Sequence, residues 1–169
     1  MTRSPTQTAD AVSATAPVVI NLLSQARYLS GVREFIFSVA RRFGFDEKSA
    51  SHIALAVDEA VCNIIRHGYD KRADGQITVG LWPVPEDAPE GRNTEGIRIV
   101  IEDSAKQVDP DKIKGRDLAD VRPGGLGVHI MKQVMNEVTY EKRAKGGMRL
   151  TMLKYLSASP SEEGDNHAD

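Results

Sequence analysis

The sequence predicts an α+β fold, a two-layer sandwich in which a mixed, mainly antiparallel sheet carries helices on one face. Two observations lead to this prediction. Segments with strand character and segments with helical periodicity follow one another in the order strand, helix, helix, two strands, helix, two strands. Both pairs of consecutive strands are joined by turn-forming segments, PEDAPEGRNTE and the Gly146-Gly147 pair, which favours hairpins over the alternating connections of a parallel sheet.

Length and composition indicate one globular domain with short tails. The chain has 169 residues, of which 40% are hydrophobic and 27% are charged. A single domain usually spans ~100–200 residues. Residues 1–16 and 157–169 are small and polar, and the second segment is also acidic, so we expect both to be flexible tails. The domain is therefore expected to occupy residues 17–156.

Charge and cysteine content exclude several classes of protein. The 22 Lys and Arg residues and 24 Asp and Glu residues give a net charge of −2, so the molecule has no overall basic field to hold nucleic acid. The single cysteine, Cys62, excludes an intramolecular disulfide. No apolar run approaches the ~18 residues of a membrane span, and no signal-peptide pattern is found. We expect a cytoplasmic protein with no direct nucleic-acid or membrane contact.

The N-terminal half of the domain predicts one strand and two helices. The run Pro17–Leu23 is rich in β-branched residues and indicates the first strand. Apolar residues three or four apart over 26–43 indicate an amphipathic helix that ends near Gly44. Asp46 has the position of an N-cap for a second helix, which we expect to run to about His67.

The C-terminal half predicts four strands, one helix and one long loop. Residues 103–123 carry turn signals and many charges but no sustained periodicity, and loops beyond ~12–15 residues are usually functional or disordered. The expected strands are Gln76–Val84, Gly96–Glu102, Glu137–Arg143 and Met148–Leu156, and the expected helix opens at 124–127 and continues to about Asn136.

Three polar residues share one stripe of the second predicted helix. Glu59, Asn63 and His67 follow one another at four-residue spacing, so each is offset by only ~40° from the last. Asparagine and glutamate offer the oxygen ligands that suit Mg²⁺, and a glutamate can orient or deprotonate a nucleophile. The stripe therefore fits a catalytic cleft, and it also fits a solvated polar face.

A glycine-rich segment, Gly124-Gly125-Leu126-Gly127, directly precedes the third predicted helix. Glycines at such a junction let backbone N–H groups turn toward an anion, and the helix N-terminus adds its positive dipole end. The segment is neither a Walker A loop nor a GxGxxG motif. It fits a phosphate site with the long loop before it as a lid, and it equally fits a linker or helix cap.

Three segments together resemble a known family. They are EAVCNIIRHGY (59–69), the Asp103 loop with VDP (108–110), and RPGGLGVHIMKQVMNEVTYE (122–141). In order and spacing they are similar to the anti-sigma-factor serine/threonine kinase branch of the GHKL, or histidine-kinase-like, ATPase superfamily, over roughly residues 17–155. The resemblance implies the Bergerat-type ATP-binding fold. It also implies a homodimeric kinase that uses ATP and Mg²⁺ to phosphorylate an anti-sigma-factor antagonist and that sequesters a sigma factor.

The resemblance assigns a role to each matching residue. It makes Glu59 the general base, Asn63 the Mg²⁺ ligand, Asp103 the acceptor of a hydrogen bond from the adenine amino group, and 106–127 the ATP lid. The other implied nucleotide contacts are His67 and Gly68 at the end of the helix, Ala105 in the turn after Asp103, and Gly124, Gly125, Leu126, Gly127 and Val128 around the phosphates. On charge alone, Arg66, Arg122, His129 and Lys132 are further candidates for phosphate contacts.

The chain departs from the family pattern at two positions. The turn after Asp103 reads Asp-Ser-Ala where the family has Asp-x-Gly, so Ala105 replaces a glycine. Met148 follows Gly147 where the family often has threonine, which leaves Thr151 as the candidate to support Asp103. The altered turn keeps one alternative open, a non-catalytic ATP-binding regulatory module in a partner-switching system. The shared fold keeps a second one open, a detached histidine-kinase-like ATPase domain.

Overall fold

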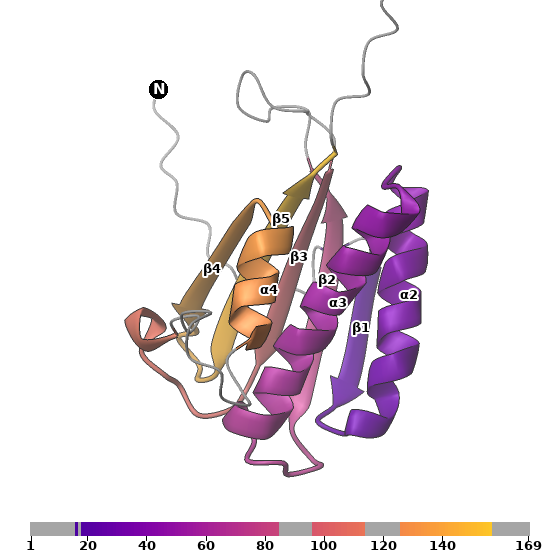
Figure 1. Cartoon of the computed structure of the whole chain (residues 1–169). Coiled ribbons are helices and arrows are strands. Elements are labelled where there is room, and N and C mark those ends of the chain that lie inside the picture. The colour runs from indigo at the N-terminus through magenta and orange to yellow at the C-terminus, as the bar shows by residue number, and fades with distance from the viewer. Residues whose placement is uncertain (1–15, 17, 85–95, 114–125, 157–169) are drawn as a thin grey trace, which may run out of the picture.

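A five-stranded sheet forms one layer of the structure (Figure 1). The computed structural model describes residues 16, 18–84, 96–113 and 126–156. Strand order is β1-β2-β3-β5-β4, and each neighbouring pair is antiparallel. The predicted α+β fold is confirmed. We expected a mixed, mainly antiparallel sheet, and all four strand pairings among the described residues are antiparallel. The strands are β1 (Val18–Leu23), β2 (Gln76–Pro83), β3 (Gly96–Asp103), β4 (Glu137–Lys142) and β5 (Met148–Tyr155).

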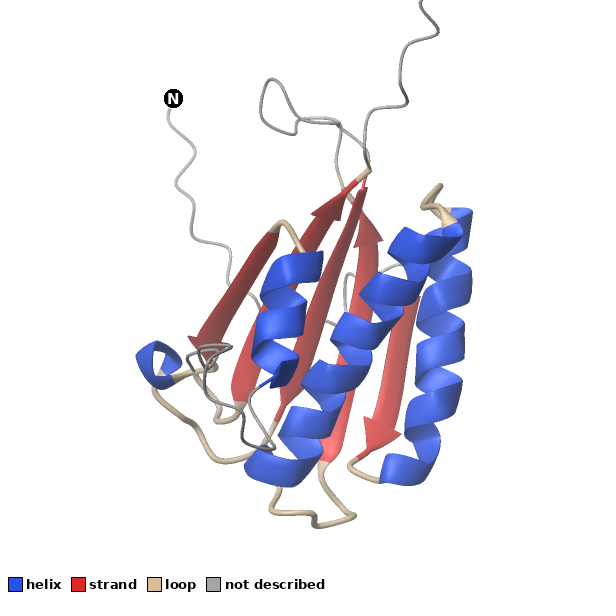
Figure 2. Cartoon of the chain, viewed as in Figure 1, coloured by secondary structure: helices blue, strands red, loops and turns tan. Residues whose placement is uncertain are grey.

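Three helices cover one face of this sheet and form the second layer (Figure 2). They are α2 (Leu29–Arg42), α3 (Glu47–Asn63) and α4 (Leu126–Val134), and α3 lies between the other two. The described residues also form two short 3₁₀ helices, η1 (Ala26–Tyr28) before α2 and η3 (Pro110–Lys112) within the predicted long loop. None of the described helices combines the length and apolar character needed to cross a bilayer.

The core lies between the two layers and centres on α3. This helix buries alanines and β-branched residues against the sheet, and Ile53 and Val57, at 0% exposure, belong to the same core cluster as Ile99 and Met152, also at 0%. Alanine side chains are short, so they allow the helix backbone to approach the strands closely. The polar stripe of α3 lies next to this buried face, which carries its side chains to the edge of the core.

The predicted start of α3 at Asp46 is confirmed. The Asp46 Oδ1 atom accepts a hydrogen bond from the Ser49 backbone N–H at 2.9 Å, and Oδ2 accepts one from Ser49 Oγ at 2.7 Å. The backbone bond from Ser49 is the main cause that lowers the pKa of this carboxyl. The cap therefore satisfies one of the N–H groups that a helix N-terminus leaves open.

The end of this helix differs from the prediction of a regular helix to His67. After Asn63 the chain continues as a π-helical turn, η2 (Ile64–Gly68), in which the Tyr69 N–H donates to Ile64 O at 2.9 Å. A π turn adds one residue per turn and is seen mostly at functional sites. Tyr69, which follows this turn, is anchored by the long-range contacts described below, and helical periodicity does not report such contacts.

Several predicted features lie outside the described residues. They include both expected tails, apart from Ala16, and the central part of the expected lid, with Arg122, Gly124 and Gly125.

Candidate functional site

A pocket opens where η2, the end of β3 and the start of α4 meet. Its polar wall residues are Asn63, His67, Asp103 and Lys106. The rest of the wall is mostly apolar and comes from the helices, the strands and the loop after β3; it includes Ile64, Ile101, Val108, Ile113, Met148 and Leu150. A largely apolar pocket with a few converging polar groups is the usual form of a small-molecule site.

This pocket gathers predicted site residues from three separate segments. Asn63, His67 and Gly68 enter from η2 and the residue before it, Asp103 and Ala105 from the end of β3 and its turn, and Val128 from α4. Leu126 and Gly127 form the first turn of α4, one residue before Val128. Segments that are far apart in the sequence thus meet at one pocket.

Glu59 stands slightly apart from this group. It is half-buried, lies one turn before Asn63 on α3, and is not part of the pocket wall among the described residues. Two of the cationic candidates also lie elsewhere. Lys132 is exposed on α4, and Arg66 lines a second cavity on the other side of η2. The suggested phosphate role of Arg66 is therefore not supported by its position.

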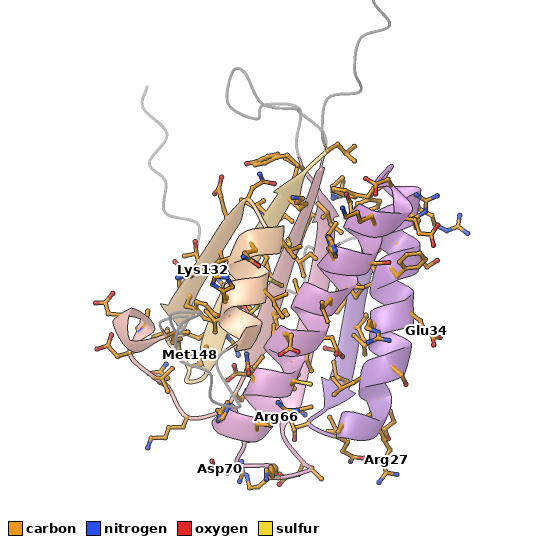
Figure 3. The ribbon with its side chains drawn as sticks, in the orientation of Figure 1. Arg27, Glu34, Arg66, Asp70, Lys132 and Met148 are labelled. Atoms are coloured by element: carbon orange, nitrogen blue, oxygen red, sulfur yellow. The ribbon has the colours of Figure 1, made fainter. Side chains whose placement is uncertain are left out.

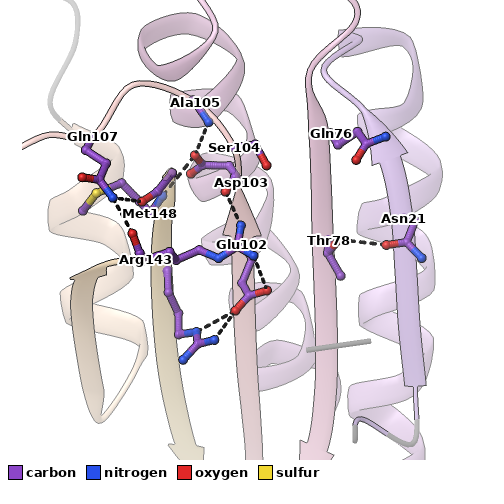
Figure 4. Close-up of polar contacts among 12 residues, drawn as sticks. Asn21, Gln76, Thr78, Glu102, Asp103, Ser104, Ala105, Gln107, Arg143 and Met148 are labelled. Carbon is purple, nitrogen blue, oxygen red and sulfur yellow. Dashed lines mark hydrogen bonds and ion pairs between the residues drawn. The ribbon is translucent and has the colours of Figure 1, made fainter. Parts of the chain in front are cut away.

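Asp103 is the buried charge of the pocket, with 4% of its surface exposed. Its Oδ1 atom accepts hydrogen bonds from the backbone N–H groups of Ala105 at 2.8 Å and Met148 at 3.2 Å (Figure 4). Burial is the main cause that raises the pKa of this carboxyl above its usual value. Since both described bonds go to Oδ1, the Oδ2 atom is left to accept from a ligand.

Ala105 fits the turn without strain. Among the described residues, only Asp70 and Lys71 are non-glycine residues with positive φ, so Ala105 does not adopt the left-handed geometry that would demand glycine. Space for its methyl group comes from Gly68, where an added Cβ would lie 3.0 Å from the Ala105 Cβ. Ala105 therefore packs against a glycine at the end of η2.

Thr151 does not support Asp103. Along β5 the side chains of Met148, Leu150 and Met152 are buried on the helix side, so Thr151 points to the opposite face of the sheet. Its register partners there are Val100 and Thr139. The Met148 backbone N–H, not a threonine hydroxyl, supplies the hydrogen bond to the carboxylate.

Gly147 allows the β4–β5 hairpin to approach Asp103 closely. Its φ is +78°, and a Cβ at this position would overlap the Asp103 carbonyl oxygen. Any side chain here would push the hairpin, and with it the Met148 N–H, away from the carboxylate. Glycine at 147 is therefore required by the geometry of the pocket.

A charged cluster on the other face of the sheet braces the end of β3. Glu102, 4% exposed, accepts a hydrogen bond from Arg149 Nε at 2.7 Å and lies 3.4 Å from Arg143 Nη2 (Figure 4). Arg143 also donates to the Asp103 carbonyl oxygen at 2.5 Å. Gln107 Nε2 donates to the carbonyl oxygens of Arg143 and Gly147, at 2.6 and 3.1 Å. Sequence reasoning missed this cluster. Its signal is a pair of opposite charges, Glu102 and Arg149, which face each other on the neighbouring strands β3 and β5.

Tyr69 is a further residue whose role sequence reasoning missed. It is 3% exposed, and its hydroxyl donates to Gln76 O at 2.6 Å and accepts from the Ser104 N–H at 2.8 Å. Its ring lies against Gly75, where a Cβ would come within 2.5 Å of the ring carbons. Tyr69 therefore joins the end of η2 to the start of β2 and to the turn after Asp103.

The Tyr69→Phe variant is expected to unfold at a lower urea concentration, with a loss of about 1 kcal/mol, because two partly buried hydrogen bonds to the backbone are removed. Tyr28→Phe is the matched control, since Tyr28 is 45% exposed. Urea unfolding followed by circular dichroism measures both variants. A Tyr69→Phe protein as stable as the Tyr28→Phe control would show that the hydroxyl bridge contributes nothing.

The donor set of the pocket fits a nucleotide with a magnesium ion. The apolar walls can enclose a flat base, Asp103 offers an acceptor, and Asn63 offers an amide oxygen. The described residues contain no group of three or more His, Cys, Asp or Glu side chains placed to hold a metal. Magnesium usually keeps several waters and binds through few protein ligands together with substrate phosphates, so the absence of such a group is compatible with a magnesium–nucleotide complex.

Comparison with known proteins gives matches over most of the chain. A family model described as histidine kinase-like ATPase domain matches residues 22–154. Serine-protein kinase RsbW of Listeria innocua is 28% identical over 149 residues, covering 86% of this chain and 91% of the relative. Serine-protein kinase RsbW of Bacillus subtilis (strain 168) is 25% identical over 143 residues, covering 79% and 82%. A solved blue-light activated histidine kinase of Erythrobacter litoralis EL346 gives a TM-score of 0.44 at 22% identity, over 78% of this chain and 42% of that one.

Proposed function

The chain belongs to the histidine kinase-like ATPase domain family, and on this premise we propose that it is an ATP-binding anti-sigma factor with protein serine/threonine kinase activity. The observation that carries the proposal is Asp103, a buried carboxylate at the wall of an apolar pocket, whose Oδ1 accepts from two backbone N–H groups and whose Oδ2 has no hydrogen bond among the described residues. This arrangement suits the 6-amino group of adenine, which donates a hydrogen bond.

The remaining pocket residues contact different parts of the nucleotide in this proposal. The apolar walls enclose the base, and Ala105 and Gly68 line the same pocket close to Asp103. Backbone N–H groups at the start of α4, from Leu126 onward, suit the phosphates, because a helix N-terminus favours negative charge. Asn63 would hold Mg²⁺, whose positive charge offsets the charge on the transferred phosphoryl group.

Glu59 takes the role of general base in this proposal. It lies half-buried on the same stripe of α3 as Asn63 and one turn before it. From there its carboxylate orients the incoming serine or threonine hydroxyl and accepts its proton. The similarity to proteins named Serine-protein kinase RsbW supports a serine as the acceptor.

The partners in this proposal are proteins. The phosphorylated substrate is an anti-sigma-factor antagonist, the second partner is a sigma factor, and the active form is a homodimer in the cytoplasm. The net charge of −2 fits a molecule that binds proteins and holds a nucleotide by local contacts. The tight phosphate contacts then come from backbone N–H groups and one metal, not from a basic surface.

A second candidate function is a regulatory module that binds ATP without transferring its phosphate. The position of Glu59 outside the described pocket wall favours this alternative. In such a module, nucleotide binding would order the lid and so control which partner docks. The two functions differ only in turnover, which makes them separable by one assay.

Calorimetric titration with ATP and ADP, with and without Mg²⁺, tests both functions together. We expect heat on titration with each nucleotide and tighter ATP binding when Mg²⁺ is present. No heat under any condition would overturn both functions. Incubation with γ-labelled ATP and the antagonist then separates them: label on the antagonist supports the kinase, and bound ATP without label supports the module.

A further inference from the structure

A second cavity lies on the opposite side of η2 from the nucleotide pocket, and three of its wall residues are cations. Arg27 comes from η1, Arg66 from η2, and Lys71 from the turn that follows η2. Figure 3 shows Arg27 and Arg66 at the same end of the molecule. Among the described residues no carboxylate lines this cavity; Asp58, which interacts electrostatically with Arg66, lies outside its wall. We call it the cationic cavity.

The floor of the cationic cavity is apolar. Leu29, Cys62 and Ile65 contribute to it, and the cavity has a volume of about 470 Å³. The three cations are exposed, so their charged ends stand in water around this floor. A ligand that fits both parts carries negative charges and an apolar group.

Hydrogen bonds hold the two sides of the cavity together. Ser24, 2% exposed, donates from its hydroxyl to Arg72 O and accepts from the Gly75 N–H at 2.9 Å. Gln25 Nε2 donates to Ala73 O at 3.0 Å. The segment before α2 is thus tied to the turn after η2, and a cavity held in this way needs little ordering on binding.

Lys71 reaches the cavity through a strained turn. Asp70 and Lys71 have φ values of 49° and 63°, and the Lys71 N–H donates to Ile65 O at 2.9 Å. Left-handed geometry is costly for residues with a side chain, and such strain tends to be kept where function requires it. The turn ends η2 and places a cation in the wall of the cavity that Arg27 also lines.

We propose that the cationic cavity is the docking site for an acidic segment of a partner protein that carries one apolar side chain among its carboxylates. Three cations from three segments match several carboxylates spread along a peptide, and the apolar floor takes the side chain between them. An inorganic anion would leave that floor unused. This docking site rests on the proposed function only in requiring that the chain has a protein partner.

The cavity is placed to connect partner binding with the nucleotide. Within η2, Ile64, His67 and Gly68 line the nucleotide pocket, while Ile65 and Arg66 line the cationic cavity. One turn of helix therefore separates the two cavities. A partner seated in the cationic cavity contacts the same turn that lines the other pocket.

Cys62 reports directly on occupancy, because it lies in the floor of the cavity and is the only cysteine of the chain. Burial raises the pKa of its thiol, so alkylation by iodoacetamide is followed at alkaline pH. The probe is a synthetic octapeptide of Asp and Glu with one central Leu, and its Asn and Gln counterpart is the neutral control. We expect the acidic peptide alone to slow alkylation of Cys62 several-fold.

Charge-reversal variants test the cations. Arg27→Glu combined with Arg66→Glu is expected to weaken binding of the fluorescein-labelled acidic peptide by about tenfold or more, since two attractions become repulsions. Lys48→Glu, an exposed position at the start of α3, is the matched control and is expected to bind as the wild type does. Equal weakening in both proteins would show a general charge effect and overturn the proposal.

Two further outcomes would also overturn it: peptide binding without protection of Cys62, and equal protection by inorganic phosphate. ATP titrated into the same samples reports on the nucleotide pocket separately. Protection of Cys62 by the peptide without any heat from ATP would overturn the proposed nucleotide function and leave the docking site standing. ATP binding without peptide protection would overturn the docking site alone.

Discussion

Replacing Glu59 by alanine is expected to lower phosphoryl transfer to the antagonist by ~10²–10⁴-fold, the usual contribution of a general base. ATP affinity is expected to stay unchanged, because Glu59 is not part of the described wall of the nucleotide pocket. Transfer is measured with γ-labelled ATP, and binding is measured by calorimetry on the same protein. The combination of lost transfer and retained binding is specific to a group that acts on the acceptor hydroxyl.

Two further variants sharpen this test. Glu59→Gln keeps the size and hydrogen-bonding capacity of the side chain but cannot accept a proton, so it separates a base from a group that only positions the hydroxyl. Glu34→Ala on α2 is the matched control, since Glu34 is an exposed glutamate on a neighbouring helix (Figure 3). Undiminished transfer by the Glu59→Ala protein would remove the assignment of Glu59 as the general base.

The second large effect is expected at Asp103, where Asp103→Asn should weaken ATP binding by at least about 100-fold. The backbone N–H groups of Ala105 and Met148 will hold the amide oxygen in the place of Oδ1, so the NH₂ group takes the place of Oδ2. A donor then faces the 6-amino donor of adenine. Inosine triphosphate, which has an acceptor at that position, is expected to bind the variant better than ATP does.

The same variant should not lose stability, which separates binding from folding. The pKa of Asp103 is raised in the folded protein, mainly by burial, so the folded state holds the proton more tightly than the unfolded state does. Ionised Asp103 therefore costs stability at neutral pH, and the cost disappears as the pH falls from the folded pKa through the unfolded value of ~3.9. Asparagine avoids the cost, so its stability advantage is expected at pH 7 and is lost at about pH 3.

Thermal unfolding from pH 7 to pH 3 measures this difference, with nucleotide binding measured in parallel. Asp74→Asn is the matched control, because Asp74 is exposed and lies outside the pocket wall. An Asp103→Asn protein that still prefers ATP to inosine triphosphate would remove Asp103 from base recognition. A variant that unfolds well below the wild type at pH 7 would show that the buried charge stabilises the fold.

Local patterns were sufficient for most of the architecture. Runs with strand character and helical periodicity predicted each strand and helix within a few residues, and Asp46 marked the start of α3. The hairpin signals predicted an antiparallel sheet, which the register of β2 with β3 and of β4 with β5 confirms. These features depend on residues close together in the chain, which is why the sequence reveals them.

The candidate site was predicted less completely. Asn63, His67 and Asp103 were selected from spacing and resemblance, and the structure brings them to one pocket. Thr151 was selected in the same way but points to the opposite face of the sheet, because successive residues of a strand alternate between faces. Moving a residue by one position along β5 transfers its side chain from the pocket side of the sheet to the opposite face. The glycine motif lies in the loop before β5, so it does not specify which strand positions face the pocket.

By itself, the sequence determined the order of the elements, the polar stripe on α3 and the family of the domain. Only the tertiary structure decided the π-helical end of that helix, the hydroxyl bridge of Tyr69, and the support of Asp103 by the Met148 N–H. It also separated Arg66 from the nucleotide pocket and placed it in the cationic cavity. The physical reason is that these contacts join residues far apart in the chain, and packing chooses their partners.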